Sequence, residues 1–287
     1  MPYAVTKDNV KLYYEEAGTG TPVIFSHEFA GDYRNWEPQM RYFARRHRAI
    51  TYSARGYKPS DVPDDWKSYS YKHWVDDVIA VLDHLKIEKA HIVGLSMGAY
   101  TAALIGFMAP QRALSLTIAG AGSGSEKSYI EEFRRASKQN AEDFLTKGTV
   151  EVVKAYGLMP ARIPFAVKDP RGFEEFNRMF SEHDAKGSSN TVRGFQAERP
   201  SLYDFEKELR TVKVPSLIIV GDEDEPCVEP SFFLKQWIAT SGLMVFPKTG
   251  HVVNQEEPAL FNEAVADFIS RVEAGRWPAR DPRSMRK

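Results

Sequence analysis

The feature that most constrains the fold of this chain is an alternation between short apolar segments and longer amphipathic ones. Apolar runs typical of buried strands occur at residues 23–25, 49–52, 90–94 and 114–119. Helical periodicity occupies the intervening residues 36–45, 71–85 and 97–108. Strands and helices that alternate in this way predict a mostly parallel sheet covered by helices on both faces. Before them, residues 3–6 and 10–14 flank a polar turn and predict a β-hairpin.

The alternation stops after residue 124 and resumes at residue 216. Residues 125–205 contain charge-rich helical stretches, at 130–144 and 172–180, but no run typical of a buried strand. Strands are expected again at 216–220 and 243–246, with one helix beginning after Pro230 and a last helix at 260–274. The sequence therefore predicts an α/β core made of residues 1–124 and 206–287, with a helical cap (lid) inserted at 125–205, before the strand that leads into an acidic loop.

Charge and cysteine content exclude several kinds of partner. The chain has 38 basic and 39 acidic residues, so no surplus charge favours nucleic acid or an anionic membrane surface. Cys227 is the only cysteine, which excludes an intrachain disulfide and a cysteine-rich metal site. No segment approaches the roughly 20 apolar residues of a membrane span, and no secretory signal is recognisable. We expect a cytoplasmic protein whose ligand is a small molecule; its oligomeric state stays open.

A G-x-S-x-G motif lies between a predicted strand and a predicted helix. It reads Gly94-Leu95-Ser96-Met97-Gly98. Glycines two residues before and after the serine let strand and helix approach closely at a sharp turn, while the hydroxyl projects from it. The helix N-terminus beside the turn favours developing negative charge. This context predicts that Ser96 is a catalytic nucleophile.

A serine hydroxyl needs a base, and the base needs an acceptor that fixes its tautomer. The strand at 216–220 leads into Gly221-Asp222-Glu223-Asp224, and Gly250-His251 follows the last strand. Both segments therefore lie at the carboxyl edge of the sheet, where sites in α/β proteins are found. The chain thus supplies a nucleophile, a carboxylate and a histidine in that order.

Together these motifs resemble the α/β-hydrolase superfamily, and the resemblance covers nearly the whole chain. It implies a catalytic triad of Ser96, His251 and Asp224, with Asp222 bracing the acid loop. The segment 26–31, Ser-His-Glu-Phe-Ala-Gly, lies where the family carries an oxyanion loop. The resemblance therefore implies an oxyanion hole formed by the backbone amides of Phe29 and Met97.

Glu28 departs from the family pattern, in which glycine is usual at this position. A carboxylate beside an oxyanion would repel the charge being stabilised, so we expect its side chain to turn toward a cation or amides behind the loop. The other histidines, at positions 47, 73, 84, 91 and 183, are expected to be structural, the first three and His183 on polar or helical faces.

Aromatic residues are frequent in the predicted cap, at Tyr129, Phe133, Phe144, Tyr156, Phe165, Phe173, Phe176 and Phe180. Most are expected to be packing residues and a few to line an apolar pocket. Acidic residues 222–225 lack the further ligands of a divalent cation site. No cofactor and no metal are expected, and Cys227 is expected to be a packed side chain.

These residues predict a serine hydrolase that cleaves a carboxylic ester of a small to medium, apolar substrate through an acyl-enzyme. Ser96 argues against the aspartate nucleophile of epoxide hydrolases. Other reactions use the same serine and stay open: those of a lactonase, thioesterase, carbon–carbon bond hydrolase, hydroxynitrile lyase or perhydrolase. A ligand receptor with slow turnover is a further alternative.

Overall fold

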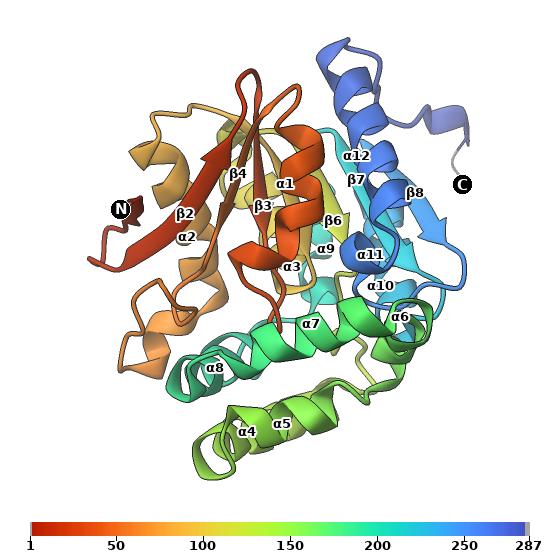
Figure 1. The fold of residues 1–287 in the computed structure, drawn as a ribbon. Helices are drawn as coiled ribbons and strands as arrows, with labels where there is room; N and C mark the ends of the chain where they lie inside the picture. The colour runs from red at the N-terminus through yellow and green to blue at the C-terminus, as the bar shows by residue number, and fades with distance from the viewer. Residues whose placement is uncertain (1, 285–287) are drawn as a thin grey trace.

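The computed structural model describes residues 2–284, which form an eight-stranded sheet (Figure 1). The strand order is β1-β2-β4-β3-β5-β6-β7-β8. All neighbours from β4 to β8 are parallel, while β2 is antiparallel to both β1 and β4. The prediction of a mostly parallel sheet is confirmed. The strand bounds are β1 Tyr3–Val5, β2 Lys11–Ala17, β3 Pro22–Ser26, β4 Arg48–Tyr52, β5 Ala90–Leu95, β6 Ala113–Ala119, β7 Ser216–Gly221 and β8 Ser241–Phe246.

Helices cover both faces of this sheet, as predicted. On one face α1 (Glu37–Phe43) contacts α12 (Pro258–Glu273), and the short helix α11 (Val253–Glu256) adjoins them (Figure 1). On the other face α2 (Tyr71–His84) packs on α3 (Met97–Met108), and α10 (Glu225–Trp237) packs on β7 and β8. β5 and β6 are buried almost throughout, because helices shield them on both sides.

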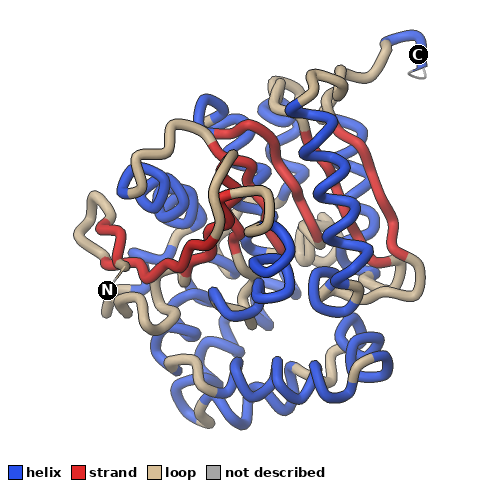
Figure 2. The backbone as a smooth tube through the Cα atoms, turned by 45° about the horizontal axis from the view of Figure 1, so that its top comes forward, coloured by secondary structure: helices blue, strands red, loops and turns tan. Residues whose placement is uncertain are grey.

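The segment 125–205, here called the cap segment, lies along one edge of the sheet, and its larger helices stack below that edge (Figures 1 and 2). Its α-helices are α4 Ile130–Thr146, α5 Thr149–Tyr156, α6 Ile163–Lys168, α7 Pro170–Ser181 and α8 Ala185–Thr191, followed by a π-helical turn at Val192–Gln196. The short helix α9 (Glu206–Leu209) then leads into β7. No strand occurs between β6 and β7 in this described stretch. The division into core and cap domains at residues 124 and 206 stays a prediction.

Aromatic side chains hold the cap segment to the core. Helix α7 begins at an N-cap, Asp169, whose side chain accepts from the Gly172 amide, and Pro170 fits the first turn. The same helix places Phe176 and Phe180 in the interior. Phe180 packs edge-on against Phe29 of the core, with ring centroids 5.7 Å apart. The cap segment therefore packs against the loop that follows β3.

One predicted helix start is wrong. We expected the helix to begin after Pro230, but α10 begins at Glu225 and contains Pro230. Proline lacks an amide donor and usually interrupts a helix. Here its ring fills the space above Gly122, and the Ser231 hydroxyl donates to the Cys227 carbonyl oxygen at 2.7 Å. Tertiary packing thus outweighs the local penalty.

No helix within residues 2–284 is both long enough and apolar enough to span a membrane.

Candidate active site

Ser96 occupies a strained turn between β5 and α3. Its backbone has φ 55° and ψ −110°, a combination that side-chain-bearing residues rarely adopt. The turn is tight because a Cβ at Gly94 would overlap the Gly98 carbonyl group, and one at Gly98 would overlap the Ser26 carbonyl group. The two glycines of the motif are therefore required by close backbone contacts, and the turn presents the Ser96 side chain to a cavity.

Asp224 and His251 come together at the same edge of the sheet. Asp224 follows β7 at the start of α10, and His251 follows β8. His251 Nδ1 lies 2.7 Å from Asp224 Oδ2, and both residues are buried. Because a carboxylate only accepts, Nδ1 carries the proton and Nε2 is left as the basic nitrogen.

His251 and Ser96 line one cavity, but no hydrogen bond joins their side chains within the described part of the chain. Such contacts are often long in the absence of substrate. The loop of His251 is fixed from the other side, since its amide donates to the Ala161 carbonyl oxygen of the cap segment at 2.8 Å. The cap segment therefore helps to place His251.

Cys227 is packed beside this pair. Its Sγ lies 3.3 Å from the Gly120 carbonyl oxygen and 3.9 Å from His251 Nδ1. Asp224, Cys227 and His251 place one potential metal ligand each within 4.8 Å of one another. Burial, with the adjacent Asp224 carboxylate, raises the pKa of the Cys227 thiol well above its usual range, which opposes the thiolate that a metal requires. Asp224 and His251 also form a direct hydrogen bond with each other.

The amides of Phe29 and Met97 lie after β3 and at the start of α3, and Met97 lines the cavity. Neither amide has an acceptor among residues 2–284. The Gly98 amide, in contrast, donates to the His27 carbonyl oxygen at 3.1 Å, which ties the two turns together. Two amides without an acceptor are a precondition of the predicted oxyanion hole, which stays a prediction here.

His27 orients one of these amides. Its Nε2 accepts from the Ala54 amide at 3.0 Å, so Nδ1 carries the proton and donates to the Glu28 carbonyl oxygen at 2.6 Å. Burial lowers the pKa of His27 to about 4, which keeps the ring neutral. The Glu28 carbonyl and the Phe29 amide belong to one trans peptide, so fixing the carbonyl points the amide the opposite way.

Glu28 turns toward a cation, as expected from the sequence. Its carboxylate forms a two-pronged ion pair with Arg162, one contact being 3.0 Å, and both side chains are buried. The guanidinium also stacks over the Tyr156 ring at 4.7 Å. Although burial opposes ionisation, Arg162 lowers the pKa of Glu28 below its ordinary value. The carboxylate is thereby neutralised by a partner from the cap segment.

Substituting Glu28 with Gln is expected to destabilise the protein by about 3–5 kcal/mol, because the buried Arg162 charge then has no partner. Urea unfolding of Glu28→Gln measures this loss. The matched control is Glu131→Gln, which removes one member of an exposed pair with Arg134 and should leave stability unchanged within error. Equal stability of the two variants would show that the Glu28–Arg162 pair does not hold the cap segment.

The cavity in front of Ser96 encloses about 400 Å³ and lies between the core and the cap segment. Of the cap aromatics, Tyr129, Phe133 and Tyr156 line it. Phe144, Phe165, Phe176 and Phe180 are instead buried in the packing of the cap segment. The expectation that only a few cap aromatics reach the pocket is confirmed, but polar and charged residues line it as well.

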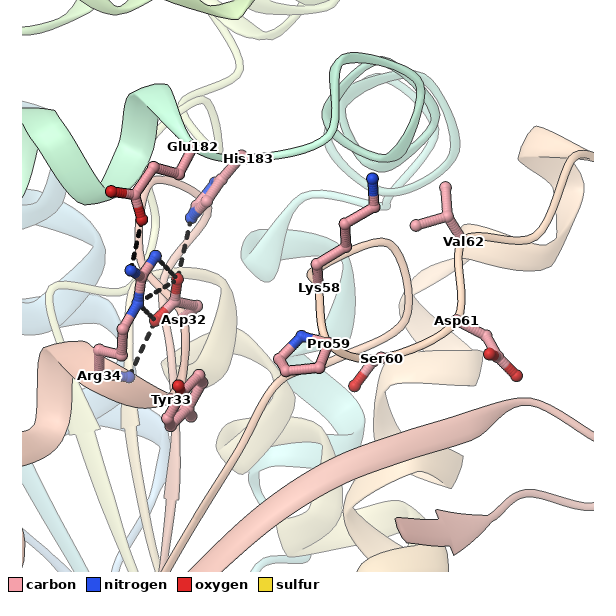
Figure 3. Close-up of a pocket in the computed structure, with 10 residues that line it drawn as sticks. All are labelled: Asp32, Tyr33, Arg34, Lys58, Pro59, Ser60, Asp61, Val62, Glu182 and His183. Atoms are coloured by element: carbon pink, nitrogen blue, oxygen red, sulfur yellow. Dashed lines mark hydrogen bonds and ion pairs between the residues drawn. The ribbon is translucent and has the colours of Figure 1, made fainter. Parts of the chain in front are cut away.

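A second hollow is lined by core residues between Asp32 and Val62 and by Glu182 and His183 of the cap segment (Figure 3). Arg34 there pairs with Asp32 at 2.7 Å and with Glu182, while His183 Nε2 lies 3.3 Å from Asp32 Oδ2. The charged groups drawn around Asp32 pair with one another (Figure 3). His183, which the sequence places on a polar or helical face, has a buried side chain.

Arg162, Ala161 and Arg199 are the site residues that the sequence did not reveal. All three come from the cap segment and reach the cavity through contacts with residues far away in the chain. The one signal for Arg162 was indirect: a carboxylate at position 28 demanded a cation. Nothing local to residues 161–162 or 199 distinguishes them from surface arginines and alanines.

Comparisons with known proteins identify the family. A family model described as alpha/beta hydrolase fold matches residues 21–258. The 3-oxoadipate enol-lactonase 1 of Acinetobacter baylyi is 26% identical over 252 residues, which cover 88% of this chain and 89% of that protein.

Solved structures show the same fold. A thermophilic esterase from Thermogutta terrifontis superposes with a TM-score of 0.84 at 23% identity, covering 94% of this chain and 98% of that one. An N-acyl homoserine lactone degrading enzyme superposes with a TM-score of 0.75 at 28% identity, covering 93% and 100%. With a family match over most of its length and this sheet order, the chain belongs to the alpha/beta hydrolase fold family.

Proposed function

We propose that this chain is a serine hydrolase that cleaves carboxylic esters, including cyclic ones, through an acyl-enzyme on Ser96. The observation that carries the proposal is the meeting of a strained serine and a buried histidine–carboxylate pair at one cavity. Relatives named as an enol-lactonase and as a lactone degrading enzyme support lactones as substrates beside open-chain esters.

In the first half of the reaction Ser96 Oγ attacks the ester carbonyl carbon while His251 Nε2 takes the hydroxyl proton. The carbonyl oxygen becomes an oxyanion and accepts hydrogen bonds from the Phe29 and Met97 amides. When the intermediate collapses, the bond to the alcohol oxygen breaks and His251 returns the proton to that oxygen. Asp224 stabilises the imidazolium throughout.

In the second half water attacks the acyl-enzyme. His251 Nε2 accepts a proton from the water and then donates it to Ser96 Oγ as the acid leaves. One proton carrier therefore serves both halves. The cap segment keeps other water out of the cavity and places His251 through Ala161.

Pre-steady-state hydrolysis of p-nitrophenyl acetate tests the proposal. If acylation precedes a slower deacylation, about one nitrophenolate per active site appears in a burst before the steady rate. Enzyme titrated in this way should give a burst that scales with protein concentration. A linear time course together with no acylated protein in quenched samples would contradict an acyl-enzyme.

The pH profile is expected to report the ionisation of His251. Burial lowers the pKa of His251, but the charge and hydrogen bond of Asp224 together raise it more, so the net shift is upward. The base acts only when neutral, so kcat/KM should fall as pH drops through a pKa above that of an ordinary histidine. Initial rates across about pH 5 to 9 locate this limb. An acid limb below the ordinary histidine value would be inconsistent with His251 as the base.

A further inference from the structure

Arg199 is a buried cation on the wall of the cavity that contains Ser96. The residue is only 8% exposed and lines the cavity together with Ser96 and His251. It follows the π-helical turn Val192–Gln196, which replaces a regular helical end just before the chain returns to the core. Such turns are rare and are frequent at functional sites.

The other charged groups of the cavity are paired. Arg162 is held by Glu28, and Lys147 by Asp143 at 2.8 Å. Glu151 pairs with Lys154, and Asp224 with His251. Arg199, in contrast, has no carboxylate within 4.0 Å in the described chain; its one hydrogen bond runs from Nη2 to the Ser123 carbonyl oxygen at 2.6 Å.

Aromatic rings surround the Arg199 guanidinium. It lies 5.0 Å from the Tyr100 ring centroid, 5.4 Å from that of Phe133 and 5.5 Å from that of Phe195. Cation–π contacts recover part of the cost of burying the charge. They do not use the five N–H donors of the guanidinium, of which the protein engages one. Burial consequently lowers the pKa of Arg199, as it does for any cation without an anionic partner.

We propose that the substrate carries a carboxylate in addition to its scissile ester or lactone, and that Arg199 binds this carboxylate. The inference rests on the proposed function. A planar guanidinium matches a carboxylate through two parallel hydrogen bonds. One unpaired positive charge fits one negative charge, which favours a carboxylate over a dianionic phosphate ester. Gln196 and Asn140 line the same cavity and offer further polar contacts. The substrate is therefore anionic, whereas the sequence alone predicted an apolar one.

The test compares two p-nitrophenyl esters of similar length, neutral p-nitrophenyl valerate and anionic p-nitrophenyl hydrogen glutarate. In the wild-type protein kcat/KM should be higher for the anionic ester by about tenfold or more. Arg199→Met should reduce this ratio by at least about tenfold, mainly through KM for the anionic ester. Arg199→Lys keeps the positive charge but lacks the planar guanidinium that forms two parallel hydrogen bonds. It should give an intermediate ratio of kcat/KM for the two esters.

Arg193→Met is the matched control, because Arg193 belongs to the same turn and stacks over Trp66 at 4.7 Å but is exposed and outside the cavity. The ratio of kcat/KM for the anionic ester to that for the neutral ester should be the same in Arg193→Met as in the wild-type protein. The melting temperature supplies a second readout: if Arg199 awaits a ligand, Arg199→Met should raise it, since an unpaired buried charge is removed.

The outcomes separate the two proposals. If neither ester is turned over and a fluorophosphonate does not label the protein, the proposed function fails. If both esters are hydrolysed in a Ser96-dependent way but Arg199→Met leaves the ratio unchanged, only the carboxylate proposal fails. A fall in melting temperature with an unchanged ratio would assign Arg199 a structural role. Tighter inhibition by inorganic phosphate than by glutarate would overturn the choice of a carboxylate.

Discussion

Ser96→Ala is expected to lower kcat for ester hydrolysis by about six orders of magnitude, the loss typical of removing the nucleophile from a serine hydrolase. No other hydroxyl occupies the turn between β5 and α3 in the described structure. Without the nucleophile, the remaining groups are expected to leave a rate about 10³–10⁴-fold above that in water. Single-turnover assays at high enzyme concentration measure the residual rate.

Folding of the variant must be separated from its chemistry. Alanine adopts the same backbone angles as serine at similar cost, so the melting temperature of Ser96→Ala should match that of the wild-type protein. Ser137→Ala is a suitable control, because it removes a hydroxyl from the cavity wall but not from the strained turn. It should cost less than about tenfold in kcat. A Ser96→Ala variant that retains a tenth of the activity would exclude a nucleophilic role.

Asp224→Asn is expected to lower kcat by about four orders of magnitude. Asparagine fits the same space, but its amide can donate to His251 Nδ1, which would then place the proton on Nε2 and remove the base. The negative charge that raises the pKa of His251 is also lost, so the acid limb of the pH profile should move to lower pH. Steady-state rates across the pH range measure both effects.

A double variant shows whether Ser96 and Asp224 act together in one reaction step or contribute independently to the rate. Because Asp224 acts only through His251 and Ser96, adding Asp224→Asn to Ser96→Ala should reduce the rate no further. Asp222→Asn is the matched control, since Asp222 accepts from the Thr249 amide at 3.2 Å and does not contact His251. Equal losses from the Asp222 and Asp224 variants would mean that the acid has been assigned to the wrong carboxylate.

The core of the fold could be predicted because its signals are local. Strands β3, β5, β6 and β7 are apolar runs, and β5 and β7 lead directly into the helices α3 and α10. Gly94 and Gly98 flank Ser96 for a reason readable in the sequence, since a Cβ at either would strike backbone atoms. The placement of Asp224 and His251 at one edge then follows from the parallel sheet.

What escaped prediction depends on contacts between distant parts of the chain. Glu28 and Arg162 are separated by 134 positions, and no periodicity links them. Proline usually interrupts a helix, yet Pro230 lies inside α10, where its ring packs against Gly122. Which charged and apolar side chains line the cavity likewise depends on how the cap segment packs on the core. An arginine at position 199 resembles a surface residue until three aromatic rings are found around it.

Covalent labelling tests the central claim most directly. The protein is treated with a fluorophosphonate, digested and analysed by peptide mass spectrometry. A nucleophilic Ser96 predicts one phosphonyl group per chain, attached to Ser96, with hydrolysis lost in proportion to labelling and no adduct in Ser96→Ala. An adduct on another residue, or full hydrolytic activity in protein that carries no label after prolonged treatment, would contradict the assignment of Ser96 as the nucleophile.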